Sequence, residues 1–132
     1  MHILRSAVYF PVLDVRAIGV YYRDVLGFAC EYSAGDPPEF ALYKRGEASI
    51  MFRRVASSER SCPNEAQGGA WDVFLWVDDA EAFYAELREK AAEVVYPPTL
   101  QPYGMKEFAV RDPNGYILGF GEAMDQPSPQ GS

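Results

Sequence analysis

An internal repeat in the sequence limits the chain to an architecture of two similar halves. Each half has one segment with alternating apolar residues, then one with apolar residues at i, i+3, i+4 and i+7, and then three short alternating segments. This order predicts a strand, an amphipathic helix and three further strands, which together form a βαβββ module. Asp14 and Asp79 open the two helical segments, about half of the 132 residues apart, and each suits a helix N-cap.

The predicted elements of the first half are a strand at 6–15, a helix at 16–28 and strands at 28–32, 40–44 and 48–53. Those of the second half are a strand at 70–77, a helix from 80 to 91 and strands at 93–96, 105–111 and 116–121. Glycine and proline clusters separate the short strands, as turns require. Gly27 follows the first helical stripe, where a helix C-terminus favours glycine.

We therefore expect an α+β fold in a single domain of residues 1–122, with halves at about 6–55 and 70–122 and a polar linker at 56–69. Residues 123–132 have the composition of a flexible tail. Each module is expected to form a curved mixed sheet with its helix on the outside. The remaining sheet faces would then form a common cleft.

The charge of the chain argues against two classes of partner. The formal net charge is −7, which disfavours nucleic acid and anionic membrane surfaces. No apolar run approaches the ~20 residues of a membrane span, and the first residues lack a signal cleavage site. We expect a soluble, cytoplasmic protein. Cys30 and Cys62 have no CxxC spacing and are expected as thiols, with a disulfide as the alternative.

The stretch AWDVFLWVDD, residues 70–79, has an unusual second face. With period two, Trp71 and Val73 begin a core stripe, whereas Asp72, Phe74 and Trp76 fall on the opposite face. Two large aromatics beside an acid suit neither a solvated face nor a dry core. They indicate the lining of the cleft. The alternative is that these rings fill the cleft or pack at a subunit interface.

Several motifs resemble one known superfamily. FPVLDV followed by YYRDVLGF, the central VDDAEAFYAEL, and EFAVRDPNGYILGF are similar to the glyoxalase, bleomycin-resistance and dioxygenase proteins, also called vicinal oxygen chelate proteins. The resemblance extends from about Ser6 to Glu122. It implies the paired βαβββ fold, and its branches include metal-dependent enzymes and metal-free binding proteins.

The metal-dependent branches of this superfamily hold a divalent ion with histidine and glutamate side chains from both halves. Placed by motif, the four ligand positions fall on Ala7, Met51, Asp72 and Gly119. Only Asp72 could bind a metal, and one carboxylate does not make a site. The single histidine, His2, lies outside this register. We therefore expect no metal and no other cofactor.

Without a metal, the pattern resembles the bleomycin-resistance proteins, which implies antibiotic resistance through binding without chemistry. We expect sequestration of an aromatic small molecule, neutral or cationic, or of a glycopeptide antibiotic such as a bleomycin-type drug. Stacking would supply affinity and carboxylates orientation. The predicted ligand-binding residues are Tyr9, Tyr43, Met51, Asp72, Phe74, Trp76, Tyr103, Met105 and Glu107.

Two further expectations concern assembly and chemistry. The resemblance implies a homodimer that exchanges an N-terminal strand, and Pro11 lies where the hinge proline of such a strand would be. The competing functional hypothesis is a metal-dependent lyase, isomerase or dioxygenase with an atypical ligand set. Asp72 and Glu107 could also form an acid–base pair, although salt-bridged structural acids are the simpler interpretation.

Overall fold

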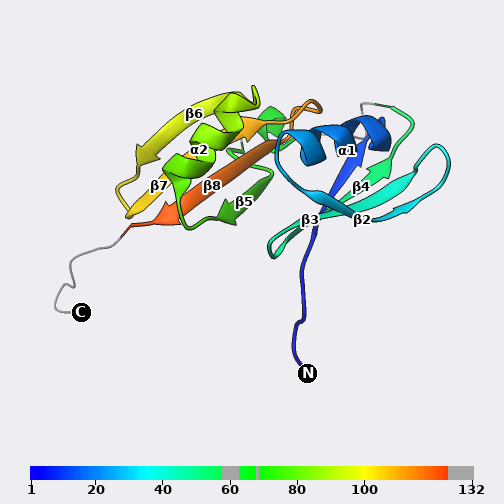
Figure 1. Ribbon diagram of the computed structural model, residues 1–132, viewed down its shortest axis with the longest axis horizontal. Helices are drawn as coiled ribbons and strands as arrows, with labels where there is room; N and C mark the ends of the chain where they lie inside the picture. The colour runs from blue at the N-terminus through cyan, green and yellow to red at the C-terminus, as the bar shows by residue number, and fades with distance from the viewer. Residues whose placement is uncertain (58–62, 68, 125–132) are drawn as a thin grey trace.

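The computed structural model describes residues 1–57, 63–67 and 69–124, and shows an α+β fold of two four-stranded mixed sheets, each with one helix (Figure 1). The first half contains β1 (Val8–Val12), α1 (Val15–Asp24), β2 (Ala29–Ala34), β3 (Phe40–Arg45) and β4 (Ala48–Arg54). The second half contains β5 (Val73–Trp76), α2 (Ala80–Glu89), β6 (Glu93–Leu100), β7 (Met105–Arg111) and β8 (Ile117–Ala123). The predicted pair of βαβββ modules is confirmed.

The two sheets have the same topology. Their strand orders are β1-β4-β3-β2 and β5-β8-β7-β6. β1 pairs with β4 and β5 with β8 in parallel, and the other pairs are antiparallel. Because β1 and β5 are edge strands, each leaves one row of backbone groups without a sheet neighbour. A short 3-10 helix (Asn64–Gln67) lies in the predicted linker.

The helix starts follow from the sequence as predicted. The side chain of Asp14 accepts a hydrogen bond from the backbone N–H of Ala17 at 3.0 Å, and Asp79 accepts one from Ala82 at 3.0 Å. Both caps have extended backbone, as N-cap residues do. β6 continues beyond its predicted end, through two prolines to Leu100. An edge strand tolerates these prolines because it lacks one neighbour.

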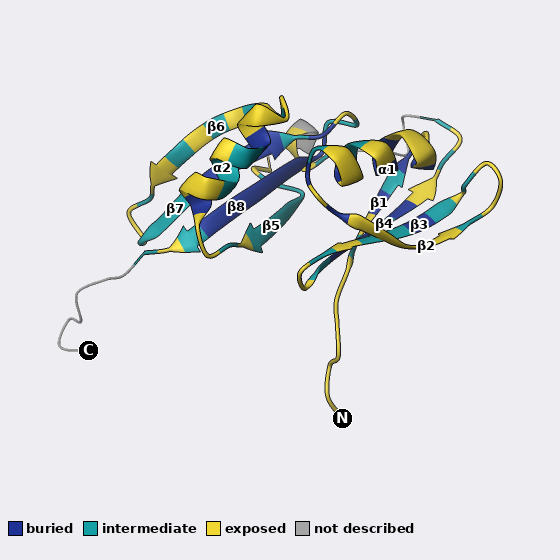
Figure 2. Cartoon of the chain, in the orientation of Figure 1, coloured by how far each residue is buried: buried dark blue, intermediate teal, exposed yellow. Residues whose placement is uncertain are grey.

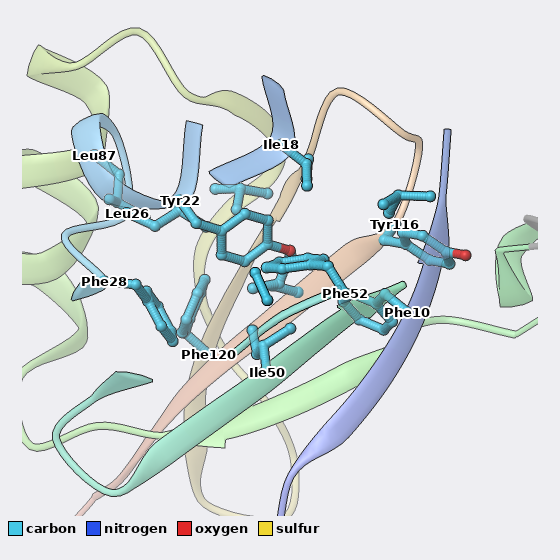
Figure 3. Close-up of a cluster of buried hydrophobic side chains, with 14 of the residues drawn as sticks. Phe10, Ile18, Tyr22, Leu26, Phe28, Ile50, Phe52, Leu87, Tyr116 and Phe120 are labelled. Carbon is cyan, nitrogen blue, oxygen red and sulfur yellow. The ribbon is translucent and has the colours of Figure 1, made fainter. Parts of the chain in front are cut away.

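Both halves contribute to one hydrophobic core beneath the helices (Figure 3). Tyr22 of α1 packs against Phe28 and Phe52, with ring centroids 5.6 and 4.8 Å away. Phe108 and Phe120 pack in the second half at 5.1 Å. β8 is almost entirely buried, whereas the segment before β1 is exposed and extends away from the body (Figure 2). The sheet faces opposite the helices are therefore the surfaces available to a ligand.

Across residues 1–57, 63–67 and 69–124, no helix combines the length and the apolar character that crossing a bilayer requires.

Candidate functional site

The open face of the second sheet, the face opposite α2, carries a cluster of aromatic side chains. Phe74 of β5 lies between Trp71, at a ring-centroid distance of 4.7 Å, and Trp76, at 5.0 Å with an edge-on ring. Trp76 is 74% exposed, which is unusual for the largest apolar side chain. Val73 and Leu75 pack against the core instead. Alternation along β5 therefore places Phe74 and Trp76 on the predicted face.

Two glycines of β8 let this cluster lie directly on the sheet. A Cβ atom at Gly119 would be 2.5 Å from Cδ1 of Trp71, and one at Gly121 would be 2.5 Å from Cζ of Phe74. The rings thus occupy the space that side chains at these positions would need. Trp71 was predicted on the core stripe, and this was wrong. β5 begins only at Val73, so its alternation does not extend back to Trp71.

Polar groups border the aromatic cluster. The indole N–H of Trp71 donates to the hydroxyl of Tyr96 at 2.8 Å. The hydroxyl of Tyr103 lies 2.8 and 2.9 Å from the two carboxylate oxygens of Glu107, which is only 3% exposed. This hydrogen bond raises the pKa of the Tyr103 phenol, and burial raises that of Tyr96. Tyr103 therefore covers an otherwise buried carboxylate from the exposed side.

Asp72 has a structural role. Its Oδ1 accepts a hydrogen bond from the backbone N–H of Asn64 at 2.7 Å, and its Oδ2 accepts one from Ile117 at 2.8 Å. The bond to Ile117 holds the residue just before β5 against the first residue of β8. The carboxylate is thus engaged by backbone donors, which argues against Asp72 as a ligand-binding anion.

On the first sheet, the structure places Tyr9 and Met51 as neighbours. They are register partners in β1 and β4, and Tyr9 is 49% exposed. Tyr43 was predicted on the same face, and this was wrong. Its ring packs against Phe52 at 5.8 Å and under Gly19 of α1, so it lies on the helix-covered side. The residue of β3 that pairs with Met51 is Leu42.

The predicted residues therefore form two groups. Phe74, Trp76, Met105 and Glu107 lie together on the second sheet, where Met105 and Glu107 approach Gly121 beside Phe74. Tyr9 and Met51 lie on the first sheet. Within the described residues, no hydrogen bond or ring contact joins the two groups.

A groove of about 820 Å³ borders the aromatic cluster at the free edge of β5. It extends from Phe74 and Trp76 to the turn between β3 and β4 and to the start of α2. The sequence offered no signal for it, because it depends on how the two halves pack. Its volume falls within the range of small-molecule sites.

The positions where metal-dependent relatives hold an ion do not fit one here. Ala7, Met51 and Gly119 supply no hard donor, Gly119 is covered by rings, and Asp72 is bonded to the backbone. In the part of the chain that the structure describes, no group of three or more His, Cys, Asp and Glu side chains could hold a metal. Cys30 is an exposed thiol, and Cys62 lies outside the described residues.

A family comparison and a structural comparison both agree with the observed fold. The model of the Glyoxalase/Bleomycin resistance protein/Dioxygenase superfamily matches residues 2–120. TioX from Micromonospora sp. ML1 is similar, with a TM-score of 0.76 and 19% identity over 91% of this chain and 98% of that chain. A comparison with curated protein sequences gives no match.

Two further solved structures differ in what they are described to do. The bleomycin-binding protein from bleomycin-producing Streptomyces verticillus, complexed with copper(II)-bleomycin, has a TM-score of 0.67 and 22% identity over 96% of this chain and 99% of that chain. Lactoylglutathione lyase from Agrobacterium tumefaciens has a TM-score of 0.64 and 22% identity over 92% of each chain. At these identities, the likenesses show a common fold.

Proposed function

The chain belongs to the Glyoxalase/Bleomycin resistance protein/Dioxygenase superfamily, and we propose that it is a metal-free, non-catalytic protein that binds an aromatic small molecule or a glycopeptide antibiotic. The fold is shared by a bleomycin-binding protein and by a lyase, so the fold alone does not distinguish binding from catalysis. The distinction has to be drawn from the side chains of the site. We also propose that the protein acts in the cytoplasm.

One observation carries the proposal: Trp76 and Phe74 form an edge-on aromatic pair on the open face, and Trp76 is 74% exposed. An exposed indole offers a planar ligand a large apolar surface at small conformational cost. A stacked aromatic pair contributes about 0.5–1.5 kcal/mol beyond area burial. A ligand that displaces the Tyr103 hydroxyl would reach the Glu107 carboxylate, which favours a ligand with a hydrogen-bond donor or a positive charge.

The metal-dependent alternative lacks support in the side chains. Of the four motif positions, only Asp72 has an oxygen or nitrogen ligand atom in its side chain, and both of its oxygens accept backbone hydrogen bonds. Glu107 is paired with a tyrosine hydroxyl. For Asp72 and Glu107 to act as a catalytic acid–base pair, Asp72 would have to lose its backbone hydrogen bonds and Glu107 its hydrogen bond to Tyr103.

We further propose that the protein is a homodimer in which the open sheet faces of two copies close over each other. Those faces carry Tyr9, Met51, Phe74 and Trp76, which favour burial. The exposed segment before β1 carries Ile3 and Leu4, 84% and 92% exposed, and can extend towards a second copy. Such closure would bury more than about 2,000 Å², as obligate dimers do.

The metal-free claim has a direct test. Protein purified without chelator is analysed for Zn, Ni, Fe and Mn, and ligand binding is then measured before and after exhaustive treatment with EDTA. We expect substoichiometric metal and unchanged affinity for bleomycin or another aromatic antibiotic. Stoichiometric metal that is lost in Asp72→Ala would overturn the proposal in favour of an enzyme.

A further inference from the structure

The two halves of the chain meet at two junctions related by the internal repeat. At the first junction, the turn between β7 and β8 meets β1 and α1, where Tyr116 bonds to Pro11 and Asp112 to Tyr22. At the second junction, the turn between β3 and β4 meets α2, where Arg45 bonds to Glu86 at 2.9 Å. The junctions are equivalent in backbone but differ in side chains.

The first junction is filled by an aromatic stack. The rings of Tyr116 and Phe10 are 4.2 Å apart and nearly parallel, at 5° (Figure 3). Tyr116 is 3% exposed, and its hydroxyl donates to the carbonyl oxygen of Pro11 at 2.7 Å. This tyrosine thus closes the junction with a ring and satisfies a backbone carbonyl of an edge strand.

The second junction lacks both rings. Phe52 pairs with Phe10 in the first sheet, and Phe120 pairs with Leu75 in the second, so Leu75 takes the place of Phe10. Tyr116 lies four positions before Phe120, and Ala48 lies four positions before Phe52. Ala48 is therefore the equivalent of Tyr116. Alanine and leucine therefore replace the tyrosine and phenylalanine. The groove of about 820 Å³ is lined by both Ala48 and Leu75.

From this asymmetry we infer that the open junction is a binding site for an aromatic ring that carries a hydroxyl donor and a positive charge. The ring occupies the position that Tyr116 occupies at the closed junction. By the same register, the residue equivalent to Pro11 is Trp76, which pairs with Gly121 of β8. Its carbonyl oxygen would accept the ligand hydroxyl at the free edge of β5.

The charge preference follows from the acids around the groove. Glu47, Asp78, Asp79 and Glu86 line it together with one cation, Arg45. Glu86 and the carbonyl oxygen of Leu26 engage Arg45, and Asp79 caps α2. Glu47 and Asp78 form no ion pair with the described part of the chain. A cationic group on the ligand would compensate these two carboxylates.

The inference goes beyond the proposed function, since it does not require that the open face bind an antibiotic. The two sites share Phe74 and Trp76 but differ in their remaining residues. The groove includes Ala48, Leu75 and Asp78, whereas the open face includes Met105 and Glu107.

Tyramine is the probe for this site, because it combines a phenol with an ammonium group. Amide resonances are followed during titration, and we expect those of Ala48, Leu75 and Asp78 to shift with saturation. 2-Phenylethylamine lacks the hydroxyl and 4-hydroxyphenylacetate reverses the charge, so each should bind at least about tenfold more weakly. Equal binding of all three compounds, or shifts confined to Met105 and Glu107, would overturn the inference.

Two sets of variants complete the test. Ala48→Tyr restores the ring of the closed junction and should lower tyramine affinity at least about tenfold, whereas Val20→Ala, at an exposed residue of α1 outside the groove, should leave it unchanged. If Ala48→Tyr fails to fold, Glu47→Gln with Asp78→Asn tests the charge preference instead. Tyramine binding that withstands either set would contradict the inference. Antibiotic binding retained in a folded Ala48→Tyr protein would leave the proposed function intact.

Discussion

The hydroxyl of Tyr22 in α1 donates a hydrogen bond of 2.8 Å to Oδ2 of Asp112, in the turn before β8, and so joins the two halves of the chain within the core. Oδ1 of Asp112 accepts hydrogen bonds from the backbone N–H groups of Asn114 and Tyr116, at 2.8 and 3.0 Å. Burial raises the pKa of Asp112 to about 6, against the opposing effect of these three donors.

This arrangement predicts a pH-dependent stability. Because the pKa of Asp112 is raised in the folded state, protonation favours folding. Its contribution is complete below the unfolded pKa of 3.8 and is lost as the pH rises through about 6. We expect the free energy of unfolding to fall by about 1 kcal/mol between pH 5 and 7, out of a total of about 3 kcal/mol over the whole transition. Urea denaturation at several pH values measures it.

Asp112→Asn is the variant that isolates this effect, because an amide keeps the acceptor for the backbone donors but does not titrate. We expect its stability to be nearly independent of pH between 5 and 7. Asp24→Asn, at an exposed ion pair with Arg23, serves as the control and should keep the wild-type slope. An unchanged slope in Asp112→Asn would assign the pH dependence to another group.

The two N-caps predict equal and separable losses of stability. Asp14 and Asp79 each bond the backbone N–H three residues ahead at 3.0 Å. Replacing either residue by alanine should lower the free energy of unfolding by about 1 kcal/mol, and the two losses should add. Substitution by asparagine, another good cap, should cost much less. Chemical denaturation that shows no difference between alanine and asparagine would refute the capping role.

Much of the fold could be predicted because it depends on local pattern. The helical spacing and the capping aspartates define the repeat, and Asp14 and Asp79 act as expected. The side-chain face of a short strand is harder to predict, because an offset of one residue moves every side chain to the other face. Such an offset at β3 misplaced Tyr43.

The site was less predictable because its contacts join distant parts of the chain. The role of Asp72 depends on the N–H of Ile117, 45 positions away. Trp71 lies on Gly119, and only the absence of a side chain there makes room for it. The groove beside β5 is open because the small side chain of Ala48 occupies the position that Tyr116 fills at the other junction. None of these relationships appears in the periodicity of a single segment.

Dimerisation predicts a concentration-dependent stability. If the open sheet faces are buried between two copies, folding and association are coupled, and the unfolding midpoint should rise with protein concentration. Thermal unfolding from about 1 to 100 µM measures the rise, and sedimentation velocity gives the mass. A folded monomer at low micromolar concentration would contradict the shared-cleft arrangement.

The measurement that tests the central claim most directly is calorimetric titration of EDTA-treated protein with bleomycin and a panel of aromatic antibiotics, in the wild type and in Trp76→Ala. Val20→Ala, at an exposed apolar residue of α1, is the control. We predict that at least one compound binds without metal, that Trp76→Ala lowers its affinity about tenfold or more, and that Val20→Ala does not. No binding by any aromatic compound, or equal affinity in Trp76→Ala and the wild type, would contradict the account.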